Sequence, residues 1–333
     1  MSGITILAIE SSCDETSAAV IEDGDLLSNI VFSQIDIHTK YGGVVPEIAS
    51  RSHLEKVTAV TDEALDKAGK TLEDLSAVAV TCGPGLVGAL LVGVSYAKAL
   101  SYSLGCRLIG VNHMRGHIGA AFLAGAQPPC LMLVVSGGHT MIVRADSYSD
   151  FTLLGSTRDD AAGEVFDKVA RVVGLGYPGG PKLDKAAEGG NEDYLVIPRA
   201  MLNEDNYDFS FSGIKSAVLN HINAAKMKNE PIDVSGVCAS FRRCVCDILV
   251  GKTMRAAKNE GINRIAVCGG VASNSLLRKM LIEACGQNGY DLTIPDASLC
   301  SDNAGMIAVS AYHQYLSGDF ASLDLNASPS LSL

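Results

Sequence analysis

The same order of secondary-structure elements is predicted twice along this chain. Residues 4–21 (ITILAIESSCDETSAAVI) and 131–144 (LMLVVSGGHTMIVR) each contain two apolar runs around a short polar turn, a pattern that predicts a β-hairpin. Later in each half, at 78–100 and 264–281, an apolar strand pattern passes through a Gly-rich turn directly into a helical pattern. Four such turns in matching order predict a duplicated α/β fold of two lobes with a central cleft.

Chain length and composition are consistent with two such lobes. With 333 residues, of which 47% are hydrophobic and 19% charged, the chain can bury two sizeable cores. We expect an N-terminal lobe at residues 1–127 and a C-terminal lobe at 128–300. A C-terminal helix and tail, residues 301–333, are expected to pack back on the N-terminal lobe.

We expect a cytoplasmic protein with no membrane partner. No N-terminal segment has the pattern of a secretion signal. The most apolar stretch, residues 86–104, is interrupted by Ser95 and Lys98, so it predicts a buried helix rather than a membrane span. The ten cysteines show no paired metal-binding spacing and are expected to be reduced thiols.

The charge of the chain argues against a free-standing nucleic-acid-binding protein. The net charge is −11, from 26 basic and 37 acidic residues, whereas phosphate contacts require Lys and Arg. Residues 215–264 do collect nine basic side chains, which are interpreted as solvated helix faces. Binding to RNA would therefore require locally concentrated basic residues or a partner that supplies them.

Two amphipathic helices are predicted between the repeated elements. The first, His53–Ala68, places Leu54 and five further residues on one apolar stripe. The second, Asp159–Val173, has Asp159 in position to cap it. The segment that follows, residues 176–184, is rich in turn formers and predicts a loop.

Two histidines have the spacing of a metal-binding pair. His113 and His117 are four residues apart in a helical pattern opened by Asn112, so both imidazoles share one helix face. A structural pair is an equally good interpretation, and a metal site would need a third ligand from elsewhere. In zinc peptidases with an H-E-x-x-H motif the Glu activates water, but Met114 occupies that position here. A peptidase is therefore disfavoured.

Three carboxylates stand out by position. Asp14 and Glu15 lie on the first hairpin turn, where an ordinary polar turn is the alternative interpretation. Asp302 begins a helical pattern, and helix capping is the better interpretation when it is taken alone.

The second hairpin turn has the composition of an anion-binding loop. Ser136, Gly137 and Gly138 resemble an oxyanion or phosphate cradle, and His139 is a ligand, a hydrogen-bond donor or simply exposed. Lys215 begins another helical pattern, either as a phosphate contact or as a solvated side chain.

These segments together resemble the universal tRNA threonylcarbamoyladenosine transferases, once described as glycoproteases. The resemblance runs from about Ile4 to Tyr315, and YGGVVPEIASR is similar to the bacterial branch. It is carried by ten ordered motifs: IESSCDETSAAV, YGGVVPEIASR, GPGLVGALLVG, NHMRGH, VSGGHT, DDAAGEVFDKVAR, YPGGP, FSFSGIK, GGVASN and CSDNAGMIA. The family implies an actin-like, sugar-kinase-like (ASKHA) fold of two related lobes.

The resemblance also implies a set of site residues. One divalent metal is expected on His113, His117 and Asp302, with iron preferred to zinc although this ligand set suits either. Threonylcarbamoyl-AMP, or an adenine nucleotide, is expected to be bound by a second set of residues, namely Val135, Ser136, Gly137, Gly138, His139, Asp167, Gly180, Asp184 and Asn274.

The reaction implied is transfer of the threonylcarbamoyl group to the exocyclic amine of the adenosine next to the anticodon, in tRNAs that read codons beginning with A. The metal would act as a Lewis acid while AMP leaves. Asp14 is the candidate for orienting or deprotonating the amine, and Glu15 is a second candidate.

Expected partners, also implied by the resemblance, are tRNA, a degenerate paralogue of the same fold and a small P-loop ATPase. A separate synthase would supply the intermediate. The alternative function is a small-molecule kinase or ATPase of the same fold, which would leave the two histidines and Asp302 without a role.

Overall fold

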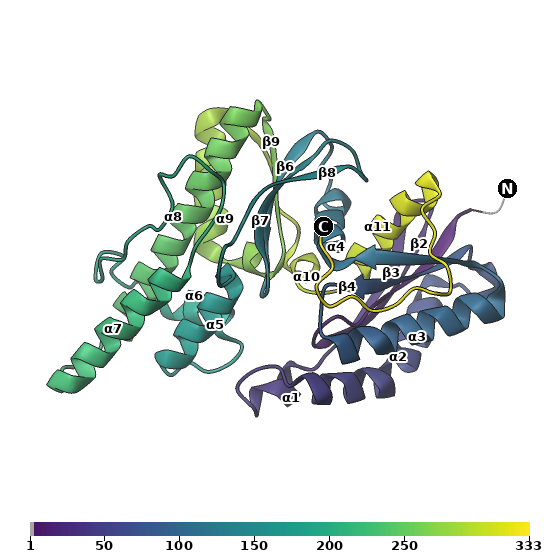
Figure 1. Cartoon of the computed structure of the whole chain (residues 1–333), viewed down its shortest axis with the longest axis horizontal. Coiled ribbons are helices and arrows are strands. Elements are labelled where there is room, and N and C mark those ends of the chain that lie inside the picture. Colours follow the sequence, from purple (N-terminus) through teal and green to yellow (C-terminus); the bar gives the residue numbers. More distant parts are fainter. Residues whose placement is uncertain (1–2) are drawn as a thin grey trace. The chain divides into compact units, whose positions relative to one another are not determined.

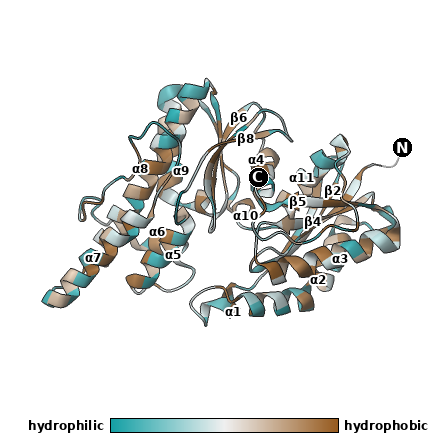
Figure 2. Cartoon of the chain, viewed as in Figure 1, coloured by the Kyte–Doolittle hydropathy of each residue, from teal (hydrophilic) through white to brown (hydrophobic). Residues whose placement is uncertain are grey.

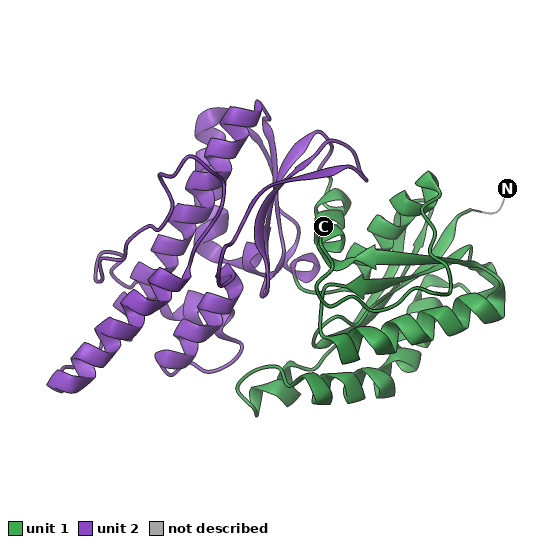
Figure 3. Ribbon diagram, in the orientation of Figure 1, with its two compact units in different colours: residues 1–125, 301–333 green, residues 126–300 purple. Residues whose placement is uncertain are grey.

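The computed structural model describes residues 3–333, which form two compact units (Figures 1 and 3). Unit 1 comprises the chain up to Gly125 together with Ser301–Leu333. Unit 2 comprises Ala126–Cys300. The polypeptide therefore leaves unit 1 once and returns to it with its last 33 residues.

Unit 1 is built on a five-stranded sheet with the order β3-β2-β1-β4-β5. The strands are β1 (Thr5–Glu10), β2 (Glu15–Glu22), β3 (Asp25–Ser33), β4 (Ala77–Gly83) and β5 (Arg107–Asn112). β1 and β2 form the first predicted hairpin, and β3 continues the antiparallel part. β4 and β5 run parallel to β1 on its other side.

Helices cover both faces of this sheet. They are α1 (Ile35–Thr39), α2 (Pro46–Ala68), α3 (Val87–Leu104), α4 (His113–Leu123) and α11 (Ala304–Ser317), with a 3₁₀ turn η1 (Leu72–Asp74). α2 packs against α3, and α4 packs against α11. Figure 1 shows these two pairs on opposite faces of the sheet.

Helix α2 differs from its prediction in two respects. It begins at Pro46, seven residues before His53, and a proline is favourable in the first turn of a helix. Leu54, predicted on the buried stripe, is 70% exposed, while the adjacent His53 is fully buried. The hydrophobic stripe was wrong at Leu54 because a polar residue, His53, occupies the buried position.

Helix α3 is the most apolar helix of the chain (Figure 2). By length and composition it is, among residues 3–333, the one helix that could cross a membrane, but core helices of soluble proteins pass the same test. Its inner face, including Leu90 and Val94, is buried, whereas Val87, Leu91 and Tyr102 are exposed. The predicted burial therefore holds for one face only.

The tail after α11 runs along unit 1 through backbone hydrogen bonds. Ala321 N donates to Leu108 O at 2.8 Å, and Ser328 N donates to Cys82 O at 2.7 Å. Near its end, Ser332 O accepts a hydrogen bond from Asn112 Nδ2 at 2.7 Å. The tail thus contacts the residue that opens α4.

Unit 2 repeats the sheet plan of unit 1, with the order β10-β9-β6-β7-β8. The strands are β6 (Cys130–Val135), β7 (Thr140–Ala145), β8 (Phe151–Ser156), β9 (Arg264–Cys268) and β10 (Asp291–Thr293). The first three are antiparallel, and β9 and β10 run parallel to β6. The duplicated α/β fold predicted from the repeated pattern is confirmed.

The helices of unit 2 differ in several respects from the sequence-based prediction. They are α5 (Ala162–Val172), α6 (Gly179–Ala186), α7 (Ser212–Lys228), α8 (Val234–Glu260), α9 (Ser275–Asn288) and α10 (Ala297–Cys300), with a 3₁₀ turn η2 (Gly270–Ser273). The predicted loop at 176–184 was wrong after residue 178, where α6 begins. Asp159 does not cap α5; its Oδ1 accepts from the backbone N–H of Phe211 at 2.8 Å, where α7 starts. A residue distant in sequence therefore satisfies a backbone N–H at the start of α7.

The basic residues at 215–264 are largely engaged within unit 2. Lys215 Nζ lies 2.6 Å from Asp160 Oδ2, so it is paired with a carboxylate and is not a free solvated lysine. Arg242 is paired with Asp184 at 2.8 Å. Lys252 is fully buried and donates to Asn206 O at 2.9 Å. The interpretation as solvated helix faces was wrong for these side chains.

All ten cysteines are free thiols. Burial raises the pKa of several of them, for example that of the Cys238 thiol to about 11.

Candidate functional site

Helix α4 brings His113 and His117 onto one face, as their spacing predicts. Asn112 caps the helix, because its Oδ1 accepts from the backbone N–H of Met114 at 2.8 Å and of Arg115 at 3.3 Å. His117 is fully buried and His113 nearly so. The two rings meet edge to face with centroids 4.7 Å apart.

Two glycines of α4 allow α11 to approach closely. A Cβ at Gly119 would lie 2.7 Å from Met306 O, and a Cβ at Gly116 would lie 2.6 Å from Ile307 Cδ1. Both distances are shorter than real Cβ contacts. The small residues therefore permit the approach that brings the start of α11 next to the histidines.

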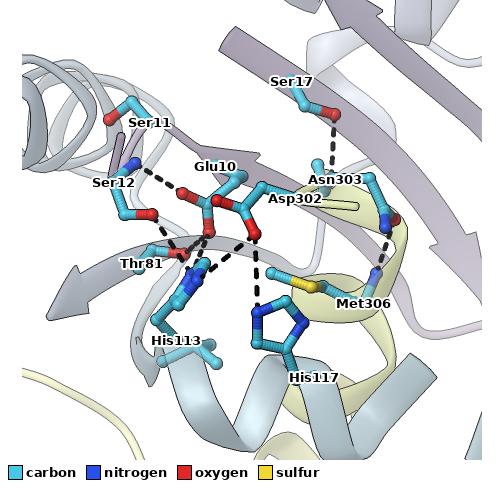
Figure 4. A network of polar contacts seen from close by, with 12 residues as sticks. Glu10, Ser11, Ser12, Ser17, Thr81, His113, His117, Asp302, Asn303 and Met306 are labelled. Atoms are coloured by element: carbon cyan, nitrogen blue, oxygen red, sulfur yellow. Dashed lines mark hydrogen bonds and ion pairs between the residues drawn. The ribbon is translucent and has the colours of Figure 1, made fainter. Parts of the chain in front are cut away.

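Asp302 lies at this start but does not cap the helix. The cap is Asn303, whose Oδ1 accepts from Met306 N at 3.1 Å. Asp302 Oδ1 instead lies 3.4 Å from Nε2 of His113 and 3.4 Å from Nε2 of His117 (Figure 4). The capping interpretation was wrong, because the next residue takes that role and leaves the Asp302 carboxylate facing α4.

These three side chains form a donor set for a cation. Their two ring nitrogens and one carboxylate oxygen all lie within 4.8 Å of one another. Imidazole and carboxylate donors in this combination suit iron or zinc. The cluster is therefore compatible with a single metal site.

Glu10 is a residue of this site that the sequence interpretation missed. Side chains alternate between the faces of a strand, so β1 directs Leu7 and Ile9 into the core beside α2 and α3 and Glu10 to the opposite face. There Glu10 Oε2 lies 3.0 Å from His113 Nδ1 and accepts from Thr81 Oγ1 at 2.6 Å. The available signal was an acidic residue ending an otherwise apolar strand.

The environment of His113 favours positive charge. Burial lowers the pKa of His113, but the carboxylates of Asp302 and Glu10 outweigh burial and raise this pKa well above its ordinary value. The contact with Glu10 engages Nδ1, so Nε2 remains directed at Asp302. A carboxylate behind a histidine in this way orients the ring and strengthens it as a metal ligand.

Asp14 and Glu15 lie on and beside the β1–β2 turn, also in unit 1. Asp14 is buried, and Glu15, the first residue of β2, accepts from Ser33 Oγ at 3.2 Å. Burial, followed by the charges of Asp14 and Asp302, raises the pKa of Glu15 to about 10. These effects favour the protonated form of Glu15, which is suited to donate a hydrogen bond rather than to accept a proton.

In unit 2, the β6–β7 turn forms a small closed loop. Val135 ends β6, Ser136 N donates to His139 O at 2.8 Å, and Ser136 Oγ accepts from His139 N at 3.2 Å. A Cβ at Gly137 or Gly138 would have no heavy atom within 4 Å. The backbone of both glycines is thus open to close approach by a ligand.

The remaining predicted residues of unit 2 form two hydrogen-bonded pairs. Asp167 Oδ1 accepts from Gly179 N at 2.7 Å and from Gly180 N at 3.3 Å, so Asp167 satisfies the start of α6. Asp184 Oδ1 accepts from Asn274 Nδ2 at 3.0 Å.

Arg242 joins the second pair and was missed as a site residue. Asp184 Oδ1 accepts from Arg242 Nη1 at 2.8 Å, and Asp184 Oδ2 accepts from Ser275 N at 3.0 Å. Asn274 is the cap of α9. This network fixes the start of α9 to α6 and α8.

A duplicated sheet plan of this kind defines the class of actin-like, sugar-kinase-like proteins, and solved structures agree. The chain is similar to full-length HypF in a phosphate- and nucleotide-bound form, with a TM-score of 0.63 and 16% identity over 96% of this chain and 47% of HypF. It is also similar to component A of the (R)-2-hydroxyglutaryl-CoA dehydratase of Acidaminococcus fermentans, with a TM-score of 0.54 and 15% identity over 94% of this chain and 99% of that one. At this level of identity the likeness shows the fold alone.

Sequence comparison gives the family. The family described as tRNA N6-adenosine threonylcarbamoyltransferase matches residues 25–309. A protein of that name from Clostridium botulinum (strain Kyoto / Type A2) is 57% identical over 99% of this chain and 98% of its own length. Another, from Clostridium perfringens (strain SM101 / Type A), is 56% identical over 98% of each chain. The chain therefore belongs to the tRNA N6-adenosine threonylcarbamoyltransferase family and is a transferase that modifies tRNA, as its motifs predicted.

Proposed function

We propose that the threonylcarbamoyl group comes from threonylcarbamoyl-AMP and is attached to N6 of the adenosine next to the anticodon, in tRNAs that read codons beginning with A. The new bond joins N6 to the carbamoyl carbon, the bond from that carbon to the phosphate oxygen breaks, and N6 loses one proton as AMP leaves. The observation that carries the site assignment is the convergence of Asp302 on His113 and His117.

His113, His117 and Asp302 would hold one divalent cation, with iron preferred to zinc. The buried carboxylate of Glu10 and the partly exposed carboxylate of Asp302 place negative charge beside the histidines, which supports a cation there. Such an ion, when bound, supplies Lewis-acid stabilisation of developing negative charge. Glu10 holds the His113 ring in the orientation that this role requires.

Asp14 is assigned to the acceptor amine and the residues of unit 2 to the adenylate. Asp14 would accept the N6 proton or orient the amine, and protonated Glu15 would donate a hydrogen bond beside it. The open turn at Val135–His139, together with Asp167, Gly180, Asp184 and Asn274, would bind the adenylate. HypF, of the same fold, is described in a phosphate- and nucleotide-bound form, which supports a nucleotide role for this fold.

Partners would supply the basic residues for tRNA contacts that this acidic chain lacks. We propose a degenerate paralogue of the same fold, a small P-loop ATPase and a separate synthase, all in the cytoplasm. Two observations support a protein partner: basic side chains of unit 2 are already paired internally, and α3 exposes an uncharged stripe. The stripe residues are Val87, Leu91, Ser95, Ala99 and Tyr102.

The test is reconstitution with unmodified tRNA, threonine, bicarbonate and ATP in the presence of the partners. We expect the threonylcarbamoylated nucleoside by mass spectrometry, and Asp14→Asn should lower turnover by about 10²- to 10⁴-fold, the usual range for a general base. Asp25→Asn, on the exposed start of β3, is the matched control. Absence of the modified nucleoside with the wild type would refute the proposed reaction, and full turnover by Asp14→Asn would refute the role of Asp14.

Glu10→Gln is expected to weaken metal binding about 10- to 100-fold, because the outer carboxylate that orients a histidine ligand is lost. Competitive titration of the metal-free protein with a chromophoric chelator measures this affinity. Glu22→Gln is the control, since Glu22, at the end of β2, pairs instead with Lys70. Equal affinity in the wild type and Glu10→Gln would contradict the assignment.

A further inference from the structure

A buried polar chain in unit 1 has no role in the reaction as described so far. It consists of His53 on α2, Gln34 between β3 and α1, and His38 on α1, and all three side chains are fully buried. Fully buried histidines need hydrogen-bond partners, and the partners here lead toward the β1–β2 turn.

His53 contacts this turn directly. Its Nε2 lies 2.9 Å from Cys13 O, and its Nδ1 lies 2.8 Å from Thr16 Oγ1. A carbonyl oxygen only accepts, so Nε2 carries the proton and donates to Cys13. Burial lowers the pKa of His53, which agrees with a neutral ring whose Nδ1 accepts from Thr16. One tautomer of His53 therefore spans both sides of the Asp14–Glu15 pair.

The other members hold the turn and α2 together. Gln34 N donates to Asp14 O at 3.0 Å, and Gln34 Oε1 lies 3.2 Å from His38 Nε2. His38 Nδ1 accepts from Val45 N, at the start of α2, at 3.3 Å. His38 thus has the same tautomer as His53. The chain of contacts connects the start of α2 to the backbone on either side of Asp14.

We infer that His53 is a positioning residue, whose Nε2–H hydrogen bond to Cys13 O fixes the β1–β2 turn so that Asp14 and Glu15 meet the acceptor amine. This inference rests on the role proposed above for Asp14. In this role His53 acts through the backbone of the turn, which it contacts at Cys13 O, rather than on the substrate or the metal ligands. A displacement of about 1 Å in a reacting group can reduce a rate about 100-fold, so loss of this hydrogen bond should appear in kcat.

Two amide substitutions at His53 distinguish the role of the Nε2–H donor from that of Nδ1. In His53→Gln the side-chain amide reaches the position of Nε2 and can donate to Cys13 O. In His53→Asn the shorter amide reaches only the position of Nδ1. Both variants are polar and uncharged, and Leu54→Ala, an exposed neighbour on the same helix, is the control.

The measurements are kcat, KM for tRNA, bound metal per chain and the thermal unfolding midpoint. We expect His53→Asn to lower kcat roughly 10- to 100-fold, with KM and bound metal unchanged, and His53→Gln to retain most of the wild-type kcat. Equal kcat values for the two variants, or a loss that follows bound metal or folded fraction, would overturn the inference.

Thr16→Val provides a second test should both His53 variants fail to fold. It removes the hydroxyl that donates to His53 Nδ1 and so holds the ring in place, while keeping side-chain volume, so kcat should fall; an unchanged kcat counts against the inference. Failure of the role proposed for Asp14 can be distinguished from failure of the role inferred for His53. If Asp14→Asn keeps full turnover, the role of Asp14 is wrong, whereas if Asp14→Asn is inactive and His53→Asn is fully active, only the role of His53 is wrong.

Discussion

Asp302→Asn is expected to leave the protein folded but largely free of metal and inactive. The substitution keeps the shape of the side chain and removes the anionic donor that lies 3.4 Å from both histidines. Loss of several kcal/mol of Lewis-acid stabilisation corresponds to a fall in turnover of about 10²- to 10³-fold or more. Bound metal is measured by atomic emission after dialysis, and turnover by release of AMP and formation of the modified nucleoside.

Ser301→Ala is the matched control for Asp302→Asn. Ser301 is exposed and precedes Asp302, and its contact with Asn303 is made through the backbone carbonyl, which the substitution preserves. A folded Asp302→Asn protein with the metal content of the wild type would contradict the proposed ligand set. Reloading metal-free wild-type protein with ferrous iron or with zinc then tests which ion supports turnover.

Asp184→Ala is expected to lower the free energy of unfolding of unit 2 by about 3–5 kcal/mol, because it leaves a buried guanidinium without its carboxylate. The Arg242 side chain is only 9% exposed, and Asp184 is its one carboxylate partner in the described part of the chain. The same carboxylate also accepts from Asn274 and Ser275. Urea unfolding followed by circular dichroism measures the change.

A second substitution tests the cause of this loss. In the Asp184→Ala background, Arg242→Met removes the unpaired charge and should restore part of the stability. Asp193→Ala, at an exposed position of the same unit, should change stability by less than about 0.5 kcal/mol. Equal stability of Asp184→Ala and wild type would show that Asp184 acts on the ligand alone.

Stability must be separated from ligand binding at this position. Adenylate affinity of Asp184→Ala should therefore be measured by calorimetry at a temperature well below its unfolding midpoint. Loss of affinity in fully folded protein would then report the role proposed for Asp184 in nucleotide binding.

Sequence patterns predicted correctly the features that depend on residues close together in the chain. Two apolar runs around a polar turn predicted both hairpins correctly, and Asn112 caps α4 as expected from its position. The four-residue spacing of His113 and His117 placed both rings on one face, because that geometry is a property of the helix itself.

Local patterns failed where the partner came from a distant part of the chain. Asp159 had the sequence context of a cap for α5 but satisfies the start of α7, more than fifty residues away. Lys215 had the context of a solvated lysine but is paired with Asp160. Hydrogen-bond partners separated by this distance are chosen by packing, which no local rule contains.

The amino-acid sequence alone was sufficient to predict the duplicated α/β plan and the histidine pair. Through its ten motifs it also indicated the family. Periodicity and spacing are short-range properties, so they can be read along the chain. Folding was needed to bring Asp302 across 185 residues to His117, to turn Glu10 toward His113, and to bury His53 behind the Asp14 turn. These contacts depend on which strand face meets which helix, and that is settled only when the sheet and its helices pack together.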